Sequence, residues 1–465
     1  MRHELNTGSH DLPVSEALAA FMKDGWEDTP LPAPARPPLA AYTAERRAAL
    51  VRRFPGERLV VPSGTLKTRS NDSDHRFRAH SAFAYLTGAR EPDDVLVIAP
   101  SGEATLFTRP RSPRSAEGTA GQEFYRDRRY GEFWVGARPT LEEAEALYQI
   151  GCAPIGRLPE ALTGPARVLR GVDATVDALM APHDGDDELA SFLSETRLVK
   201  DEWEIAELQH AVDATARGFE DVVRALPQAL AHPRGERYVE GIFGLRARLE
   251  GNATGYDSIA ASGAHACVLH WIRNDGRLSP GEMLLLDAGV ESDGLYTADV
   301  TRTLPVSGRF GPIHRQVYEL VYEAQTAAIA TLRPGARFRD FHRAAMAVIA
   351  EGLREWGVLK STGDDLHRRY TLCSSGHMLG LDVHDCAKAR SSVYLDGVLA
   401  AGQVLTVEPG LYLQPDDLTL PPEFRGIGVR IEDDLVVTED GARLMSSALP
   451  RRPGEVESWM GGLLG

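Results

Sequence analysis

The sequence predicts an α+β protein in which a smaller α/β domain, residues 41–195, precedes an α+β domain, residues 196–450, with a curved antiparallel sheet. Up to residue 195, short apolar runs alternate with helical patterns, which is typical of an α/β domain. Beyond it, groups of strands are separated by paired helices. The length of 465 residues also favours two or three domains.

Segments outside these domains are predicted at both ends of the chain. Residues 1–40 form an N-terminal arm, in which residues 14–23 have the pattern of a short amphipathic helix capped by Ser15. Residues 29–39 contain five prolines, which exclude a helix or a central strand and predict an extended segment. Residues 451–465 are predicted to be a loosely held tail.

The elements of the first domain follow from its apolar periodicity. Helices are predicted from near Thr43, at 141–148 and at 187–198, buried strands at 59–61 and 94–99, and a polar loop at 112–132.

The second domain begins with a change of pattern at Asp201. Residues 201–225 place apolar side chains at helical spacing, and a second helix is predicted at 238–249. Further helices are predicted at 312–332 and 338–356, and strands near 255–261, 267–272, 283–288, 296–306, 378–384, 403–413 and 428–437.

Composition excludes several classes of protein. The formal net charge of -16 argues against a general nucleic-acid binder, which needs a basic surface. The four cysteines are scattered, which predicts a reduced compartment rather than a disulfide framework. The N-terminus has no apolar signal region, and no run approaches the roughly 20 apolar residues of a membrane helix. We therefore expect a cytoplasmic protein with no membrane or nucleic-acid partner.

Two carboxylates draw attention to the centre of the second domain. An apolar run ends at Asp287, a turn-like stretch follows, and a second strand-like run carries Asp299. A β-hairpin would bring these two side chains together. Buried neighbouring carboxylates repel unless a positive group lies between them, so either a metal ion or hydrogen bonding to turn amides would account for the pair.

Three further stretches supply possible metal ligands. His377 and His384 lie in a glycine-flanked apolar stretch, where a core histidine is the alternative. Glu408 ends an apolar run before Pro-Gly, and a simple strand-end glutamate is the alternative. Glu432 shares one strand face with Arg430, and a solvated ion pair is the alternative.

Taken together, these stretches give an oxygen-rich set of ligands. It consists of Asp287, Asp299, His377, Glu408 and Glu432. Such a set favours Mn²⁺, with Zn²⁺, Co²⁺ or Fe²⁺ as alternatives. Because four carboxylates are best balanced by about two divalent cations, a two-metal site is expected.

The motifs that carry these residues resemble those of the Xaa-Pro aminopeptidases (aminopeptidase P), of the pita-bread group of metallopeptidases. They are Asp287-Ala-Gly, Asp299-Val-Thr-Arg-Thr, Gly376-His-Met-Leu-Gly-Leu-Asp-Val-His-Asp, Thr406-Val-Glu-Pro-Gly-Leu-Tyr and Gly428-Val-Arg-Ile-Glu-Asp. In the first domain, Thr68-Arg-Ser-Asn-Asp and Tyr85-Leu-Thr-Gly are similar to that family's N-terminal domain. The resemblance covers roughly residues 41–450.

The resemblance implies a fold, an activity and a set of site residues. It implies a pita-bread catalytic domain with a dinuclear metal centre, usually Mn²⁺. This centre releases the N-terminal residue of peptides that have proline in second position, through attack of a bridging hydroxide. Asp287, Asp299, His377, Glu408 and Glu432 then correspond to metal ligands, with Glu408 also acting as a general base or acid. His270, His384 and Arg430 correspond to catalytic residues, and Tyr256 to a pocket residue. A homodimer or homotetramer acting on peptides is expected.

One departure concerns the substrate pocket. Many members carry a histidine four residues before the ligand histidine, whereas this chain has Cys373 there. The change leaves the expected metal ligands intact and bears on substrate preference or rate.

Other activities fit the same sequence. Prolidase, which cleaves only dipeptides, is the nearest alternative, and a peptide hydrolase recruited to a biosynthetic pathway is another. A non-catalytic peptide-binding protein on the same fold is less favoured, because such relatives generally lose metal ligands and all five residues are present here.

Overall fold

The computed structural model describes residues 14–27, 31, 39–114 and 122–465. It divides into two compact units between Asp187 and Glu188, a few residues before the boundary expected at 195. Most of the proline-rich segment 29–39 lies outside the described residues. None of the helices within the described ranges is long and apolar enough to cross a membrane.

The first unit is built on a mixed sheet with the strand order β6-β5-β4-β1-β7. Its strands are β1 (Leu59–Pro62), β4 (Val95–Ile98), β5 (Ala104–Thr108), β6 (Gly151–Pro154) and β7 (Arg167–Val168). The pairs β1–β7 and β5–β6 are parallel, and the others are antiparallel. Val60 and Val97 lie in its core, as the apolar runs predict, and Val168 of β7 joins them there.

Short helices and one hairpin complete this unit. They are α1 (Glu16–Phe21), α2 (Leu39–Arg53), α3 (Ser81–Thr87), α4 (Glu123–Arg126), α5 (Glu132–Val135), α6 (Leu141–Tyr148), α7 (Leu158–Ala161), α8 (Ala174–Leu179) and the strands β2 (Thr68–Ser70) and β3 (Ser73–Asp74). Ser15 caps α1 as predicted, since its hydroxyl accepts from the N–H of Leu18. The predicted loop at 112–132 includes α4, so that prediction was incomplete.

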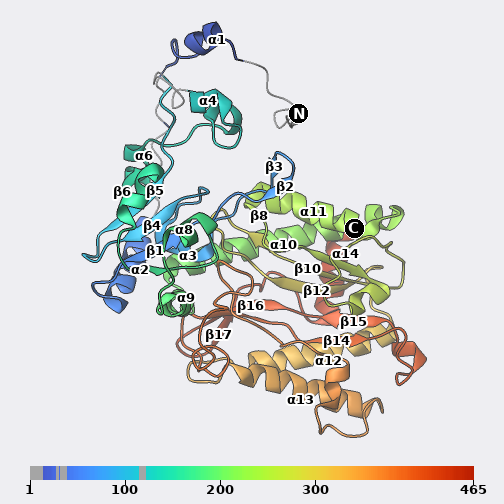
Figure 1. The fold of residues 1–465 in the computed structure, drawn as a ribbon. Coiled ribbons are helices and arrows are strands. Elements are labelled where there is room, and N and C mark those ends of the chain that lie inside the picture. The colour runs from blue at the N-terminus through green and yellow to red at the C-terminus, as the bar shows by residue number, and fades with distance from the viewer. Residues whose placement is uncertain (1–13, 28–30, 32–38, 115–121) are drawn as a thin grey trace, which may run out of the picture. The chain divides into compact units, whose positions relative to one another are not determined.

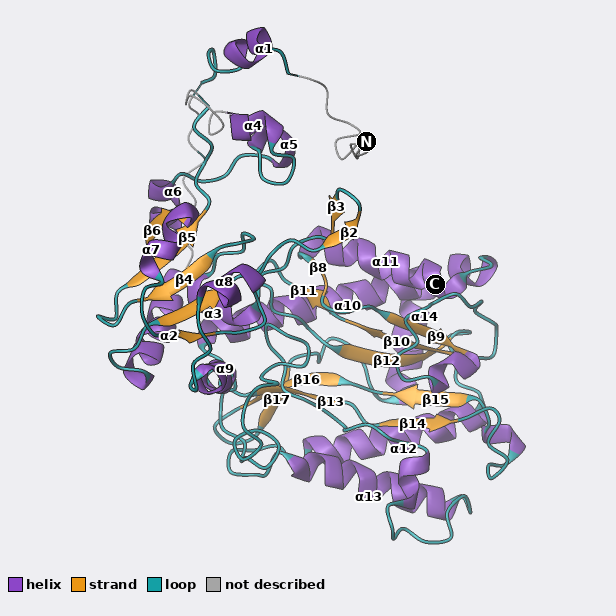
Figure 2. Cartoon of the chain, in the orientation of Figure 1, coloured by secondary structure: helices purple, strands orange, loops and turns teal. Residues whose placement is uncertain are grey.

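Helix α9 (Asp186–Glu195) leads into the second unit, in which two helix pairs flank antiparallel strands (Figure 2). The pairs are α10 (Glu202–Ala231) with α11 (Gly235–Glu250), and α12 (Pro312–Ile329) with α13 (Arg339–Glu355). Helix α10 begins where Asp201 and Glu204 form a capping box. Its apolar face, including Phe219 and Val222, packs in the main core.

All strand pairs of the second unit are antiparallel, which confirms the sequence prediction. The sheets are β12-β10-β9, β13-β16-β17, β14-β15 and β11-β8. Their strands are β8 (Ala253–Thr254), β9 (Ile259–Ser262), β10 (Met283–Ala288), β11 (Val290–Glu291), β12 (Val300–Pro305), β13 (Val404–Val407), β14 (Gly410–Leu413), β15 (Ile427–Arg430), β16 (Asp433–Val437) and β17 (Ala442–Leu444). Figure 1 shows these strands between the two helix pairs.

Two predicted strands are absent from the described structure. Residues 267–272 follow a 3₁₀ turn at Gly263–Cys267 and run on as a loop, because the buried carboxylate of Glu236 binds the segment from one side. Residues 378–384 form a loop with one bridge, Met378 to Leu405, because Asp385 is held by buried cations instead of a strand partner.

The prediction of a loosely held tail is wrong. Residues Pro453–Leu464 form helix α14, and its Val456 and Met460 are fully buried in the main core. The pattern was missed because only a few apolar side chains of this short helix face inward.

Candidate metal centre and active site

Strand register brings the four carboxylates together. In the β10–β12 pair Asp287 lies opposite Thr301, and Asp299 immediately precedes β12. In the β13–β16 pair Val407 lies opposite Asp433, so Glu408 and Glu432 extend from adjacent strand ends. The N–H of Glu432 donates to the carbonyl of Thr301 at 3.0 Å, which joins the two sheets at the site.

Asp287 and Asp299 form the predicted close pair. The hydroxyl of Tyr256 contacts Oδ1 of Asp287 at 2.6 Å and Oδ1 of Asp299 at 2.5 Å. Burial, followed by the charges of these two carboxylates, raises the pKa of Tyr256 well above its usual range, so the phenol stays protonated. One hydroxyl carries one proton, so it can satisfy only one of the two oxygens as a donor.

Arg430 fixes the orientation of Asp287. Its Nη2 donates to Asp287 Oδ2 at 2.5 Å, its Nη1 to the Tyr412 hydroxyl at 2.9 Å, and its Nε to Thr301 Oγ1 at 3.2 Å. Arg430 therefore lies beside the carboxylate cluster and holds Asp287 in place. The family resemblance predicts an arginine at this position near the site.

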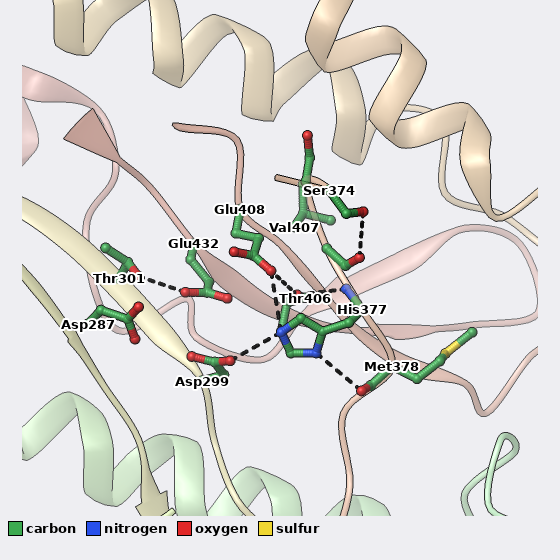
Figure 3. Close-up of polar contacts among 12 residues, drawn as sticks. Asp287, Asp299, Thr301, Ser374, His377, Met378, Thr406, Val407, Glu408 and Glu432 are labelled. Atoms are coloured by element: carbon green, nitrogen blue, oxygen red, sulfur yellow. Dashed lines mark hydrogen bonds and ion pairs between the residues drawn. The ribbon is translucent and has the colours of Figure 1, made fainter. Parts of the chain in front are cut away.

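Glu432 has one satisfied and one unsatisfied oxygen. Its Oε2 accepts from Thr301 Oγ1 at 2.7 Å (Figure 3). Its Oε1 is buried and has no hydrogen-bond partner among the described residues. An orphaned carboxylate oxygen that faces other carboxylates is the donor that a metal ion requires.

His377 presents its second ring nitrogen to the same cluster. Its Nδ1 lies 3.2 Å from the carbonyl of Met378, which fixes the proton on Nδ1. Its Nε2 faces Asp299 Oδ2 and Glu408 Oε1, each at 3.3 Å (Figure 3). The ring is thus oriented as in metal-binding histidines, with Nε2 directed at the carboxylates.

The charges of the cluster are not balanced by the protein alone. Burial, opposed by His377 and reinforced by Asp299, raises the pKa of Glu408 to about 7. Burial and the charges of Asp299 and Glu408 hold the pKa of Glu432 well above its usual range. Burial would lower the pKa of His377, yet the Asp299 hydrogen bond and the Glu408 charge raise it to about 9. A cation would relieve the repulsion that these shifts record.

The residues present fit a divalent metal. Ligand atoms of Asp299, His377 and Glu432 all lie within 4.8 Å of one another. Asp287 and Glu408 border the same group (Figure 3). Carboxylates with one imidazole are the donor set expected for a hard or borderline divalent ion.

One cavity of about 270 Å³ contains every predicted site residue. Besides the five candidate ligands, it is lined by Tyr256, His270, Cys373, His384 and Arg430. The rings of His384 and His377 meet edge to face at 4.4 Å between centroids. Burial and the neighbouring His377 lower the pKa of His384, which keeps its imidazole neutral near pH 7.

The loop that carries His270 is organised by Glu236, a residue that sequence reasoning missed. This fully buried carboxylate on α11 accepts from Ser262 N, His265 Nδ1, Trp271 Nε1 and Gly276 N at 2.6–2.9 Å. Four contacts from one side chain fix both ends of the loop. No local motif marks it, although a glutamate on the buried face of a helix is itself an unusual position.

The loop that carries His384 is fixed in a similar way. Asp385 is buried between Lys200 Nζ, at 3.0 Å, and Arg197 Nη2, at 3.0 Å. These charges lower the pKa of Asp385 in spite of burial, which by itself would raise it. The sequence did not point to this contact, because Asp385 lies 188 residues from Arg197 and 185 from Lys200 along the chain.

Thr301, Tyr412 and Asp434 were also missed. Thr301 and Tyr412 contact Arg430, and Asp434 Oδ2 accepts from the N–H of Asp299 at 3.0 Å. The period-two rule placed Thr301 on the same strand face as Asp299, and that signal was available.

The fold and the site together define a metalloenzyme with a pita-bread catalytic domain. A family model described as metallopeptidase family M24 matches residues 206–439, and one described as the N-terminal domain of aminopeptidase P matches residues 43–167. The chain therefore belongs to metallopeptidase family M24, which implies a divalent metal.

Similar proteins agree with this assignment. Xaa-Pro aminopeptidase 1 of Streptomyces coelicolor is 55% identical over 466 residues, which cover 97% of this chain and 93% of that protein. Xaa-Pro aminopeptidase of Escherichia coli is 32% identical and covers 89% of this chain, with 96% of its own length matched.

Solved structures show the same architecture. The aminopeptidase PepP of Pseudomonas aeruginosa superposes with a TM-score of 0.79 at 30% identity, covering 93% of this chain and 99% of that one. Aminopeptidase P from E. coli with the inhibitor Pro-Leu gives a TM-score of 0.78 at 29% identity, covering 91% and 98% of the two chains.

Proposed function

We propose that this chain is a metal-dependent aminopeptidase that releases the N-terminal residue from peptides with proline in second position. The observation that carries the proposal is the convergence of four carboxylates and His377 on one cavity that also contains His270 and His384. The names of the relatives, with identities up to 55%, supply the substrate class.

We further propose that Asp287, Asp299, His377, Glu408 and Glu432 hold two divalent ions, with Mn²⁺ first and Co²⁺, Zn²⁺ or Fe²⁺ as alternatives. Such ions, when bound, lower the pKa of water to near neutrality and act as Lewis acids. The unsatisfied Oε1 of Glu432 and the raised pKa of Glu408 support a cation here.

In this proposal Glu408 accepts the proton of the attacking water and returns it to the proline nitrogen that leaves. A carboxylate can make both transfers, and Glu408 borders the ligand cluster, with its Oε1 3.3 Å from His377 Nε2. His270 and the neutral His384 donate hydrogen bonds to the oxyanion of the tetrahedral intermediate. Arg430 and Tyr256 hold Asp287 and Asp299 in position.

We also propose a cytoplasmic location and a homodimer or homotetramer as the working form. The four scattered cysteines, which suit a reduced compartment, support the location.

The test compares three substrate types with Mn²⁺ supplied. Xaa-Pro-Yaa tripeptides, Xaa-Pro dipeptides and Xaa-Ala-Yaa controls are assayed for release of the first residue. Cleavage of the tripeptides supports the proposal, whereas cleavage of dipeptides alone identifies a prolidase. Metal binding without cleavage of either points to a specialised substrate, and no metal binding points to a peptide-binding protein.

A further inference from the structure

A second, larger cavity of about 740 Å³ lies in the same unit and shares one lining residue, Cys373, with the catalytic cavity. Its walls come from α13, from the 3₁₀ turn Leu366–Arg369 and from residues 371–374. Cys373, four residues before His377 in the sequence, therefore borders both cavities.

This cavity is rich in cationic and imidazole side chains. Arg339, His342, Arg343, His367 and Arg368 line it. Arg339 pairs with Asp396 at 3.0 Å and Arg343 with Asp340 at 3.2 Å, so two of the guanidinium groups are already neutralised. The guanidinium of Arg368 makes no hydrogen bond or ion pair with any described residue, and its side chain is exposed.

His342 offers a hydrogen-bond donor in the same cavity. The N–H of Ser375 donates to its Nδ1 at 3.2 Å, so the neutral ring carries its proton on Nε2. Burial lowers the pKa of His342, and the charged groups that act on it most strongly, His367, Arg368, Arg339 and Arg343, lower it further. All four are cationic when charged, so the local potential at this ring is positive.

Two carboxylates also line the cavity, and both interact with other residues. Glu351 pairs with Arg354 on the exposed side of α13. Asp365 acts on the buried His367, whose Nδ1 has no hydrogen-bond partner among the described residues. Neither contacts Arg368 or His342 through an interaction of its side chain, so these two groups are left to bind an incoming anion.

The volumes of the two cavities indicate which part of a peptide the larger cavity could bind. Ligand pockets have volumes of about 300–1,000 Å³. The catalytic cavity, at about 270 Å³, suits the residues that flank the cleaved bond, and a longer peptide has to leave it. Cys373 lines both cavities, so a peptide that extends past this residue reaches the larger one.

We propose that this basic cavity is a distal substrate subsite that binds a carboxylate of the peptide downstream of proline, through Arg368 and the Nε2–H of His342. The inference rests on the proposed function and adds a preference for longer peptides that carry an anionic group. That group is either the C-terminal carboxylate or an acidic side chain.

The test uses Ala-Pro peptides of three to six residues in matched pairs. One arm compares each free acid with its C-terminal amide, and a second compares Glu with Gln at each position after proline in amidated peptides. For at least one length or position, the anionic member should have a kcat/KM about tenfold higher, as expected for one charge-assisted hydrogen-bonded contact. The arm that shows the effect identifies the source of the carboxylate.

Variants test whether the preference for anionic peptides comes from the basic cavity. Arg368→Ala should bring the ratio of anionic to neutral substrate down to about one, mainly through a higher KM for the anionic peptide. The matched control is Arg224→Ala, an exposed arginine on α10 outside this cavity, which should keep the wild-type ratio.

Three outcomes would overturn the subsite. Equal kcat/KM values within all pairs would overturn the subsite. If neutral Xaa-Pro peptides are still cleaved in that case, the proposed function is retained. A preference that Arg368→Ala does not alter would overturn it as well. Failure to cleave any Xaa-Pro peptide would overturn the proposed function and the subsite together.

Discussion

At the scale of single residues, Glu408 combines two proposed roles, those of a metal ligand and of a general base, since its Oε1 lies 3.3 Å from His377 Nε2 at the edge of the cluster. Glu408→Gln keeps the size of the side chain and removes its capacity to take a proton. We expect kcat to fall by about 10²–10⁴-fold, the usual contribution of a general acid or base. Steady-state assays with a Xaa-Pro tripeptide check this. Glu439→Gln, in an exposed turn, is the control, and near-normal turnover of Glu408→Gln would contradict the role.

We expect Tyr256 to stabilise the metal-free site more than the loaded one. Tyr256→Phe removes the donor shared by Asp287 and Asp299 and keeps the ring. Leaving a buried acceptor unsatisfied costs about 1–3 kcal/mol, so the metal-free protein should lose about that much stability. The Mn²⁺-loaded protein should lose less, because the cation takes over the stabilisation of both carboxylates.

Thermal unfolding with and without Mn²⁺ measures this difference. Tyr322→Phe is a matched control, because among the described residues the Tyr322 hydroxyl accepts a hydrogen bond only from the exposed Arg452, at 3.4 Å. An equal loss in both states would show that Tyr256 has no special relation to the metal.

At the scale of elements, the loop that carries His270 depends on Glu236. Glu236→Gln replaces an oxygen acceptor with an NH₂ group, so N–H groups of the loop lose their partner. The expected cost is about 1–3 kcal/mol of unfolding free energy for each donor left unsatisfied.

The same change should displace His270 and lower kcat about tenfold in the folded fraction. Circular dichroism establishes that fraction, and Glu240→Gln on the same helix is the control. A folded variant with unchanged kcat would show that Glu236 does not position the site.

The loop that carries His384 depends on a buried ion pair. Asp385→Asn removes the buried carboxylate that pairs with Lys200 and leaves Arg197 with the partly exposed Asp382 at 3.5 Å, which should cost about 3–5 kcal/mol. Asp382→Asn is the control, because that carboxylate is 42% exposed and contributes about 0–1 kcal/mol as a surface partner of Arg197.

The effect also has a defined pH dependence. The pKa of Asp385 is lowered in the folded state, so its contribution is present above the unfolded pKa of about 3.9 and is lost as the pH falls through the folded value. Denaturation at several pH values measures the difference in unfolding free energy between the wild type and Asp385→Asn. This difference should be constant from pH 8 to about 5 and should shrink below about pH 4. An advantage that disappears already near pH 6 would contradict this assignment.

At the scale of the whole molecule, strand patterns predicted the antiparallel catalytic unit and the five candidate ligands. The family resemblance added the other site residues that line the same cavity, namely Tyr256, His270, Cys373, His384 and Arg430. Asp287, Glu408 and Glu432 could be found because charged residues at the ends of apolar runs are conspicuous in a sequence. Glu236, Asp385 and Asp434 could not, because their importance comes from partners that only the folded chain provides. Helix α14 was missed for the same reason, since its burial depends on the core it meets.

The five candidate ligands are spread along the sequence from Asp287 to Glu432, and all lie within the unit Glu188–Gly465. A bound metal would therefore link β10, β12, β13, β15 and β16 to the loop of His377. Free Mn²⁺ at about 100 times its dissociation constant should stabilise the folded state by about 2.7 kcal/mol.

Hydrogen exchange of the full chain tests where this stabilisation acts. Addition of Mn²⁺ to chelator-treated protein should increase amide protection in residues 283–305 and 404–437 and leave β1 and β4 of the first unit unchanged. Asp287→Asn together with Glu432→Gln should abolish the effect, since these changes remove charge from two ligands without altering size. Equal protection throughout both units, or protection retained in the double variant, would mean that the ion binds elsewhere.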